Sequence, residues 1–343
     1  NVAKNYETAQ DLVKEAIAKI EEISKQEGLS GVPSGFTKVD RVTAGWQPSD
    51  LIILAARPGM GKTAFVLSMA RNMAIDHNRP VAVFSLEMAS VQLITRLISG
   101  ETGLSSEKLR KGTLDDHEWQ QLLTKVKALE KAPLYIDDTP AISIFDLSAK
   151  CRRLVAQSNI QLIVIDYLQL MTAGGKSNGN REQEISTISR SLKSIAKELK
   201  VPVIALSQLS RAVETRGGAK RPMLSDLRES GSIEQDADIV CFLYRAAYYG
   251  VNNDEETGDE DPNLSQILIR KHRNGSLGDV NLRFVPNFAK FENVGSEQIH
   301  TFMSKGNQGN SFNPGEGFNA EENNTDLGPS IEPPTFGDDN PPF

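Results

Sequence analysis

The sequence predicts an α/β fold, with a mainly parallel, twisted β-sheet, helices on both of its faces and an antiparallel hairpin at its end. Short, continuous apolar runs alternate with longer amphipathic stretches from residue 36 onward. Such runs are typical of parallel strands buried on both faces. The run at 267–271 is followed by an Asn-Gly step and a second strand-like run, which indicates a hairpin.

Each predicted element has its own pattern. Strands are expected where the apolar runs lie, at 51–56, 81–86, 134–136, 162–166, 203–207, 239–244 and 267–271. Helices are expected near 62–77, 89–100, 115–130, 143–158 and 183–200, where apolar residues recur at three- and four-residue steps. The alternation of strand and helix predicts that consecutive strands run parallel.

The first 30 residues predict a separate linker helix and hinge. Apolar residues recur at helical spacing over 8–24, and a stretch rich in glycine follows at 26–35. Such a helix cannot bury its apolar stripe against itself, so it packs either on its own domain or on a neighbour. The first residue is Asn, which indicates a fragment or a processed product.

Charge is distributed unevenly along the chain of 343 residues, whose net charge is −7. Residues 296–343 hold eight acids and one base, lack periodicity and predict a disordered acidic tail. The acidic stretch 250–263 adds six acids, and the remaining body holds 37 bases and 31 acids, a net charge of +6. The positive charge of this body is therefore compatible with an anionic partner such as nucleic acid.

Several classes of protein are disfavoured. No run approaches 18 apolar residues, and the first residues lack a signal-like apolar segment. Two cysteines and four dispersed histidines suggest neither a disulfide framework nor a zinc site. We expect no membrane partner and a cytoplasmic location.

A phosphate-binding loop is the strongest motif. Residues 56–63 read Ala-Arg-Pro-Gly-Met-Gly-Lys-Thr between a predicted strand and a predicted helix, the setting of a P-loop, although Ala56 stands where the pattern has its first glycine. Lys62 is expected to neutralise the β- and γ-phosphates of ATP, and Thr63 to bind Mg²⁺. The residues expected to contact the nucleotide are Arg57, Gly59, Gly61, Lys62, Thr63, Ala64 and Asp166.

Polar residues follow three other predicted strands. Asp166 ends the run 162–166, where a carboxylate would hold Mg²⁺ through water. Glu87 follows the strand after the P-loop helix and is a candidate to activate the attacking water, although a surface glutamate is common there. Gln208 follows the next strand and is a candidate sensor of the γ-phosphate. Lys271 and Arg273 project to the same side of the last predicted strand and are candidates to stabilise transition-state charge, or else form an exposed basic edge.

Together these motifs resemble the RecA-fold motor domain of the hexameric replicative DNA helicases of the DnaB family. The matching segments are 34–65, 84–88, 162–170, 205–211, 227–240 and 270–275, in the order of the family. The resemblance implies a linker at 1–30, an ATPase motor at 31–295 and a tail at 296–343, without the helical N-terminal domain of the family. It also implies a homohexameric ring that hydrolyses ATP at subunit interfaces, translocates 5′ to 3′ on single-stranded DNA at the replication fork, and works with a primase and a helicase loader. Lys271 and Arg273 match the basic pair that acts on the neighbour's nucleotide.

Two segments are expected to contact DNA. The first is 171–182, with Lys176 and Arg181. If it does not contact DNA, this segment is a flexible surface loop. The second is 226–235, where Arg228, Glu229 and Gly231 match the strand-binding loop of the family. If it does not contact DNA, this segment is a structural turn. Contacts to phosphates would make binding independent of base sequence and sensitive to salt.

Alternatives remain open at this point. The P-loop and the strand-end acids are shared with RecA-like recombinases and with clock-type ring ATPases, and a DNA-binding adaptor or loader would use the P-loop only as a switch. The tail ends in two acids and Phe343, resembling the tip of bacterial single-stranded-DNA-binding proteins, so it is either a contact for replication proteins or a solubilising extension.

Overall fold

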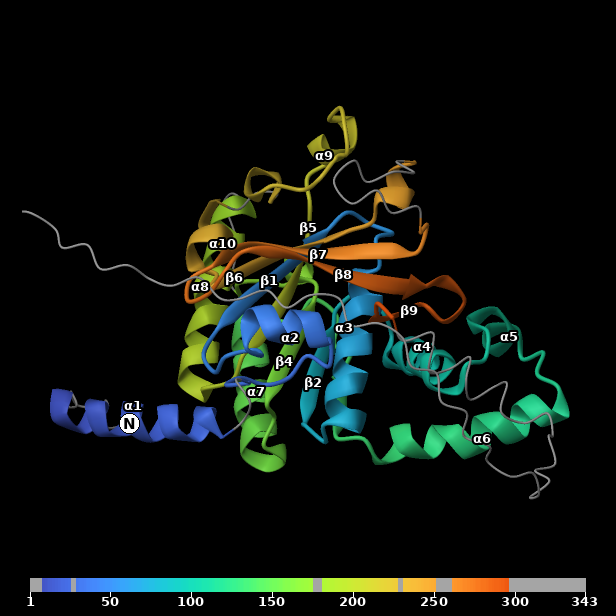
Figure 1. Cartoon of the computed structure of the whole chain (residues 1–343), viewed down its shortest axis with the longest axis horizontal. Helices are drawn as coiled ribbons and strands as arrows, with labels where there is room; N and C mark the ends of the chain where they lie inside the picture. The colour runs from blue at the N-terminus through green and yellow to red at the C-terminus, as the bar shows by residue number, and fades with distance from the viewer. Residues whose placement is uncertain (1–7, 26–28, 175–180, 228–230, 251–260, 296–343) are drawn as a thin grey trace, which may run out of the picture. The chain divides into compact units, whose positions relative to one another are not determined.

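Nine strands form one mixed sheet in the computed structural model, which describes residues 8–25, 29–174, 181–227, 231–250 and 261–295 (Figure 1). The strand order is β3-β2-β4-β5-β1-β6-β7-β8-β9. The first six strands in that order are parallel: β3 (Leu134–Asp137), β2 (Val81–Ser85), β4 (Leu162–Asp166), β5 (Val203–Gln208), β1 (Leu51–Ala56) and β6 (Ile239–Tyr244). The last three are antiparallel: β7 (Leu264–His272), β8 (Gly278–Val285) and β9 (Lys290–Asn293). The predicted fold class is confirmed.

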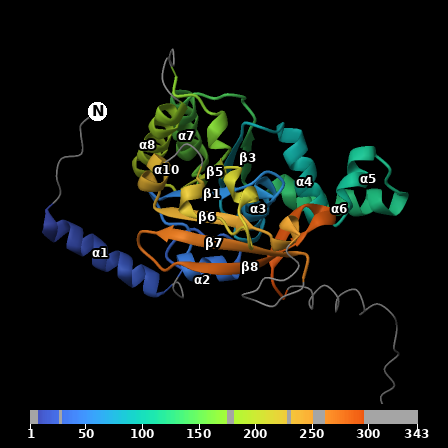
Figure 2. The ribbon, with the colours of Figure 1, turned by 90° about the horizontal axis from the view of Figure 1, so that it is seen from above.

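Helices cover both faces because successive residues of each central strand point to opposite sides. In β1, Leu51, Ile53 and Ala55 pack toward α7 (Ile144–Ser158), α8 (Arg181–Leu199) and α10 (Gly231–Asp236). Ile52, Leu54 and Ala56 pack toward α2 (Thr37–Thr43) and α3 (Lys62–Arg71) on the other face. Figure 2 shows α7, α8 and α10 together on one side of the central strands and α2 on the other. All six residues of β1 are buried, so β1 is a central strand of the domain.

A smaller helical group packs on α3. Leu67 of α3 meets buried leucines of α4 (Ser90–Thr102) and α6 (Asp116–Lys131), and α5 (Ser106–Lys111) joins these two helices. The group also includes Leu134 at the start of β3, which is only half-buried. One face of β3, the edge strand, thereby packs against this helical group through Leu134 and Ile136, while Tyr135 stays exposed.

The predicted strands and the five predicted helices of the motor agree with the structure to within a few residues. The helix predicted over 62–77 is α3 followed by one π-helical turn at 72–76. The short elements α2, α5, α9 (Ala212–Thr215) and α10, together with β9, were not predicted. Each has four to seven residues, too few to show a hydrophobic period.

The predicted hairpin is confirmed by the antiparallel pairing of β7 with β8, and its loop is longer than a two-residue turn. Five residues, 273–277, join the two strands, and Gly275 does not adopt a left-handed conformation. A Cβ atom at Gly275 would lie 2.1 Å from the His272 ring. The glycine is required there by the close approach of the ring rather than by turn geometry.

The helix predicted at 8–24 is α1 (Ala9–Ser24). Four of its large apolar side chains are about half exposed, at 47–65%: Leu12, Val13, Ile17 and Ile20. Its apolar stripe therefore has no complete cover among the described residues. Within those residues, no helix has the length and apolar character that crossing a membrane requires.

Candidate functional site

The loop between β1 and α3 has the backbone of a phosphate cradle. Gly59 and Gly61 adopt φ angles of +80° and +101°, which side chains disfavour. Ala56, which departs from the P-loop pattern, is the last residue of β1 and is fully buried. An alanine suits that extended position, so the departure leaves the two glycines that shape the loop in place.

Lys62 opens α3 and lies next to the loop. Its Nζ is 3.4 Å from the carbonyl oxygen of Ala56 and 5.5 Å from the centre of the Tyr167 ring. Burial lowers the pKa of Lys62, against the opposing influence of Asp166 and Glu87. The ammonium thus lies in a partly desolvated position, where attraction to a phosphate is stronger than in water.

Thr63 and Asp166 form the polar centre of the site. The hydroxyl of Thr63 donates to Oδ2 of Asp166 at 2.6 Å, which joins the start of α3 to the end of β4. Asp166 is buried, and its Oδ1 has no hydrogen-bond partner among the described residues. Burial raises the pKa of Asp166, while Thr63 and Lys62 lower it. A hydroxyl and an unsatisfied carboxylate oxygen are the hard oxygen donors that suit Mg²⁺.

Glu87 and Gln208 lie at the same edge of the sheet. Glu87 is exposed, two residues beyond β2, and its charge acts on both Lys62 and Asp166. Gln208 ends β5 and pairs with Ala56 in the register of β1 and β5. Because parallel strands end at one edge, the fold brings the predicted residues of β1, β2, β4 and β5 together.

Arg57 and Ala64 have structural roles in addition to their predicted contact with nucleotide. Arg57 is buried, and its guanidinium donates to Glu214 and to the carbonyl of Leu209, both at 2.8 Å. It therefore fastens the P-loop to the segment after β5. Ala64 is buried under the loop, so only its backbone is placed to meet a phosphate.

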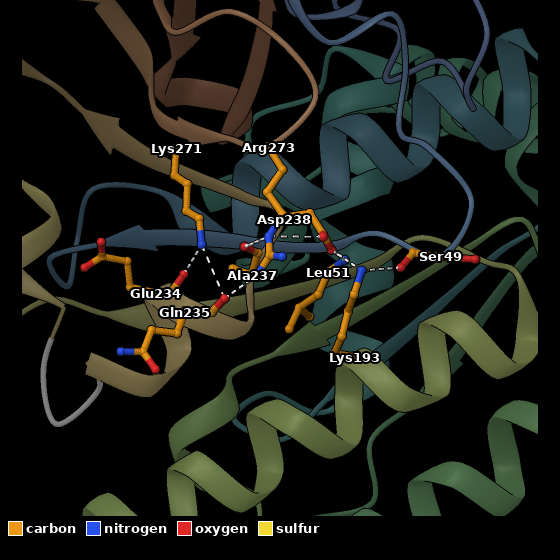
Figure 3. Close-up of polar contacts among 9 residues, drawn as sticks. All are labelled: Ser49, Leu51, Lys193, Glu234, Gln235, Ala237, Asp238, Lys271 and Arg273. Carbon is orange, nitrogen blue, oxygen red and sulfur yellow. Dashed lines mark hydrogen bonds and ion pairs between the residues drawn. The ribbon is translucent and has the colours of Figure 1, made fainter.

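The basic pair, Lys271 and Arg273, lies at the other end of the strands from the P-loop, where the parallel strands begin. Lys271 and Arg273 stand at and just beyond the end of β7, where Val240 and Ile239 at the start of β6 pair with Lys271 and His272. Lys271 donates to the carbonyls of Glu234 and Gln235, and Arg273 to those of Gln235 and Ala237 (Figure 3). The length of a six-residue strand, about 17 Å, separates this edge from the P-loop. The pair is thus held away from the nucleotide site of its own chain.

Only part of the expected DNA surface can be placed. Lys176, Arg228 and Glu229 lie outside the described residues. Gly231 is exposed at the first position of α10. Arg181 opens α8 and donates to Glu184 and, at 2.6 Å, to the carbonyl of Gln169. The Arg181 guanidinium thus fixes the C-terminal end of segment 171–182 to the backbone that follows β4.

Several residues of the site were missed from the sequence. The guanidinium of Arg245 lies 4.1 Å from the centre of the Phe284 ring, and Phe284 and Phe291 would meet a Cβ atom at Gly61 at 3.7 and 3.2 Å. The hydroxyl of Tyr248 donates to the carbonyl of Pro58 at 3.0 Å. The signal was the Arg-x-x-Tyr-Tyr sequence directly after the apolar run 239–244, at the edge where the P-loop lies.

Gln169 was also missed. Its Nε2 donates to Oγ of Ser207 at 2.8 Å, and its Oε1 accepts from the backbone N–H of Gln208 at 3.3 Å. The side chain therefore ties β5 to the segment after β4. Only the packed sheet brings Gln169 and Ser207 into contact, so no local pattern identified the pair.

Comparison with known proteins supplies the family. The family description "DnaB-like helicase C terminal domain" matches residues 31–293. The chain is 51% identical over 290 residues to the replicative DNA helicase DnaB of Geobacillus stearothermophilus and 50% identical to the replicative DNA helicase DnaC of Bacillus subtilis. Each alignment covers 84% of this chain and 62% of the relative, so the chain spans less than two thirds of these relatives' length.

Solved structures agree with this assignment. One that is described as an ATPase domain superposes with a TM-score of 0.74 at 42% identity, covering 82% of this chain and 98% of that one. A DnaB-like replicative helicase, described with its interactions with primase, gives a TM-score of 0.73 at 39% identity, covering 86% and 68%. The order of the motifs, the fold and both comparisons agree, and the chain belongs to the DnaB-like helicase family, whose C-terminal domain it contains.

Proposed function

We propose that the chain is the motor of a replicative DNA helicase, which hydrolyses ATP at the subunit interfaces of a homohexamer and translocates on single-stranded DNA to unwind the duplex. The observation that carries the proposal is the distribution of charged groups over the two edges of the sheet. Lys62, Thr63 and Asp166 meet at one edge, whereas Lys271 and Arg273 are held at the other. A complete hydrolytic site then requires a second subunit.

The residues of the P-loop edge bind and orient ATP. Lys62 neutralises charge on the β- and γ-phosphates, and the backbone of Gly59 and Gly61 approaches them closely. Thr63, and Asp166 through water, would hold Mg²⁺, which would neutralise developing charge on the phosphates.

Glu87 is proposed to accept a proton from the attacking water, and the exposed position of its side chain allows water to reach it. Gln208 is proposed to bind the γ-phosphate. Its backbone is tied to Gln169, whose carbonyl accepts from Arg181, so that loss of the phosphate is relayed toward segment 171–182. Lys271 and Arg273 of the neighbouring subunit stabilise the transferring phosphoryl group.

The nucleotide base has a proposed surface beside the P-loop. The Arg245 guanidinium stacked on Phe284 presents a flat, polarisable face near Gly61. Planar cation and ring surfaces favour stacking of a base.

The remaining partners follow from the family. DNA is proposed to contact segments 171–182 and 226–235, including Lys176, Arg181, Arg228, Glu229 and Gly231. One solved relative is described with its interactions with primase, and we extend a primase contact and a helicase loader to this chain. The linker 1–30 is proposed to pack on an adjacent subunit, and the tail 296–343, outside the described residues, to contact replication proteins through Phe343. The complex would work in the cytoplasm at the replication fork, with 5′ to 3′ polarity.

Steady-state ATP hydrolysis with and without single-stranded DNA tests the proposal. The unmodified chain is expected to show hydrolysis stimulated by DNA, Lys62→Ala to show none, and Arg273→Ala to lose about a thousandfold in rate. The rate of unwinding of a forked duplex is expected to change in the same direction in these variants. Hydrolysis that ignores DNA would instead identify a non-translocating ring ATPase, and strand exchange without unwinding would identify a recombinase.

A further inference from the structure

Asp238, which precedes β6, is a buried carboxylate that the proposed reaction does not use. It is 6% exposed and lies at the edge of the sheet opposite the P-loop. Its Oδ2 accepts from the backbone N–H of Leu51 at 2.8 Å and from the ammonium of Lys193, and its Oδ1 lies 3.5 Å from Nε of Arg273 (Figure 3). One side chain thus joins β1, α8 and the end of β7.

The contacts of Asp238 are held by rigid elements. Lys193 also donates to the carbonyl of Ser49 at 2.8 Å, and the backbone N–H of Arg273 donates to the carbonyl of Asp238 at 2.9 Å. Leu51 is fully buried in the central strand. The carboxylate is therefore fixed in place from three directions, whereas the Arg273 side chain is itself about half exposed.

Arg273 has two kinds of partner in this part of the structure. The carbonyls of Gln235 and Ala237 accept from its guanidinium, and Asp238 supplies the carboxylate that pairs with it among the described residues. Carbonyls attract a guanidinium through dipoles, while a carboxylate attracts it through a full charge. The direction of the Arg273 side chain therefore depends on the charge at Asp238.

We infer that Asp238 is a positioning residue for ATP hydrolysis, which holds Arg273 in the orientation that reaches the neighbouring subunit's nucleotide. The inference rests on the proposed trans-acting role of Lys271 and Arg273. A half-exposed arginine without a fixed anion samples many rotamers, and misplacement of a catalytic group lowers turnover steeply. Asp238 touches neither nucleotide nor reacting water, and its effect is exerted through Arg273.

The charge of Asp238 can be removed with little change in shape. In Asp238→Asn the amide oxygen still accepts from Leu51, while the amide N–H₂ faces the N–H of Arg273 as donor against donor. We expect kcat for ATP hydrolysis to fall at least about tenfold and KM for ATP to change less than about twofold, because the P-loop lies at the other edge.

Subunit mixing separates positioning from a general structural role. Lys62→Ala subunits have an inactive P-loop and an intact basic pair, and Asp238→Asn subunits have the reverse. When the two are mixed, roughly one interface in four joins an intact P-loop to an intact pair, so hydrolysis should rise above that of either variant alone. The double variant carrying both substitutions, mixed with Asp238→Asn, should not recover, since no interface then contains a correctly held pair.

Two controls keep the test decisive. Asp50→Asn removes a second buried carboxylate near the same network and should retain near-normal turnover. If Asp238→Asn does not fold, Asp238→Asn combined with Lys193→Met removes the unpaired ammonium as well and should behave as predicted for Asp238→Asn. Lys193→Met alone should retain most of the turnover.

The outcomes distinguish the two proposals. If Arg273→Ala mixed with Lys62→Ala shows no recovery, the trans-acting role of the pair is wrong and the inference fails with it. If that mixture recovers but Asp238→Asn shows normal turnover, or is impaired without recovery on mixing, only the positioning role is overturned.

Discussion

At the scale of the residue, burial controls the chemistry of the charged groups. Asp166 lies in the sheet with one oxygen bound to Thr63 and the other without a partner among the described residues. Burial raises the pKa of Asp166 and lowers that of Lys62, and each charge opposes the effect of burial on the other. Binding of a cation and a phosphate at this site is strongly favoured, because Asp166 and Lys62 then each face an opposite charge in a poorly solvated environment.

Asp50 gives a pH-dependent prediction at the same scale. Burial, with Asp238 as a second cause, raises the pKa of Asp50 to about 6, while Lys193, His272 and Arg273 lower it. The folded state then holds a proton that the unfolded state releases above about pH 4, so this group lowers stability as the pH rises toward 6 and above. Asp50→Asn should stabilise the fold by about 3 kcal/mol at pH 8, because a shift of one pKa unit corresponds to about 1.4 kcal/mol, and the gain should vanish near pH 4.

Denaturant titration of both proteins across that pH range measures the difference. An unchanged gain at pH 4 would show that ionisation of Asp50 is not its cause.

At the scale of the element, single side chains fasten strand ends that local sequence does not connect. Arg57 ties the P-loop to Leu209 and Glu214, and Gln169 ties the segment after β4 to the end of β5. These contacts lie at the edge where the nucleotide is proposed to bind. They keep the ends of neighbouring strands at the spacing that the chemistry requires.

The contact between Gln169 and Ser207 predicts a coupled pair. Ser207 is fully buried, so Gln169→Leu leaves its hydroxyl without its bond and should destabilise the fold by about 1–3 kcal/mol. Ser207→Ala should cost less, and the double variant should cost less than the sum, because the two residues share one hydrogen bond. Thermal unfolding of the four proteins tests this, and strict additivity would contradict it.

ATP hydrolysis gives a second measure of the same pair. Gln169→Leu also frees the backbone N–H of Gln208, so it should weaken stimulation by DNA more than Ser207→Ala does. Equal stimulation in both variants would argue against a relay through Gln169.

At the scale of the whole molecule, two features of the described residues bear on the proposed ring of subunits. The apolar stripe of α1 is about half exposed, and the basic pair lies far from the P-loop of its own chain. Apolar surface of this kind is buried by association. In the ring that we propose, each subunit would supply its linker and its basic pair to a neighbour, which accounts for both features.

Ile17→Glu tests the role of α1. The side chain is 52% exposed, so a glutamate should leave the unfolding of the motor unchanged within about 0.5 kcal/mol. If the stripe joins subunits, the variant should require higher protein concentration for both assembly and ATP hydrolysis. Sedimentation velocity and hydrolysis rate over a concentration series measure the two effects, and Gln10→Glu, at an exposed polar position of the same helix, is a matched control that also adds one negative charge.

Much of the motor could be predicted because its signals are local. Six buried strands appear as continuous apolar runs, and the P-loop, Asp166 and Gln208 follow strand ends, where parallel topology alone brings them together. The sequence therefore determined the fold class, the family resemblance and the end of the sheet at which we propose that the nucleotide binds. These properties depend on side-chain periodicity and on short motifs, which are read within a few residues of one another.

Other features were decided only by the tertiary structure. Local sequence patterns did not reveal the contacts of Arg273 with Asp238 and α10. They also did not reveal the hydrogen bond between Gln169 and Ser207 or the stacking of Arg245 on Phe284. The partners in these contacts are separated by roughly 35 to 40 residues in the sequence. Each contact joins strands of the same part of the sheet, β4 with β5 or β6 with β7 and β8, or the segments next to them, and the chain between these elements separates the partners in sequence. The energies of such contacts depend on distances and burial that exist only in the folded state.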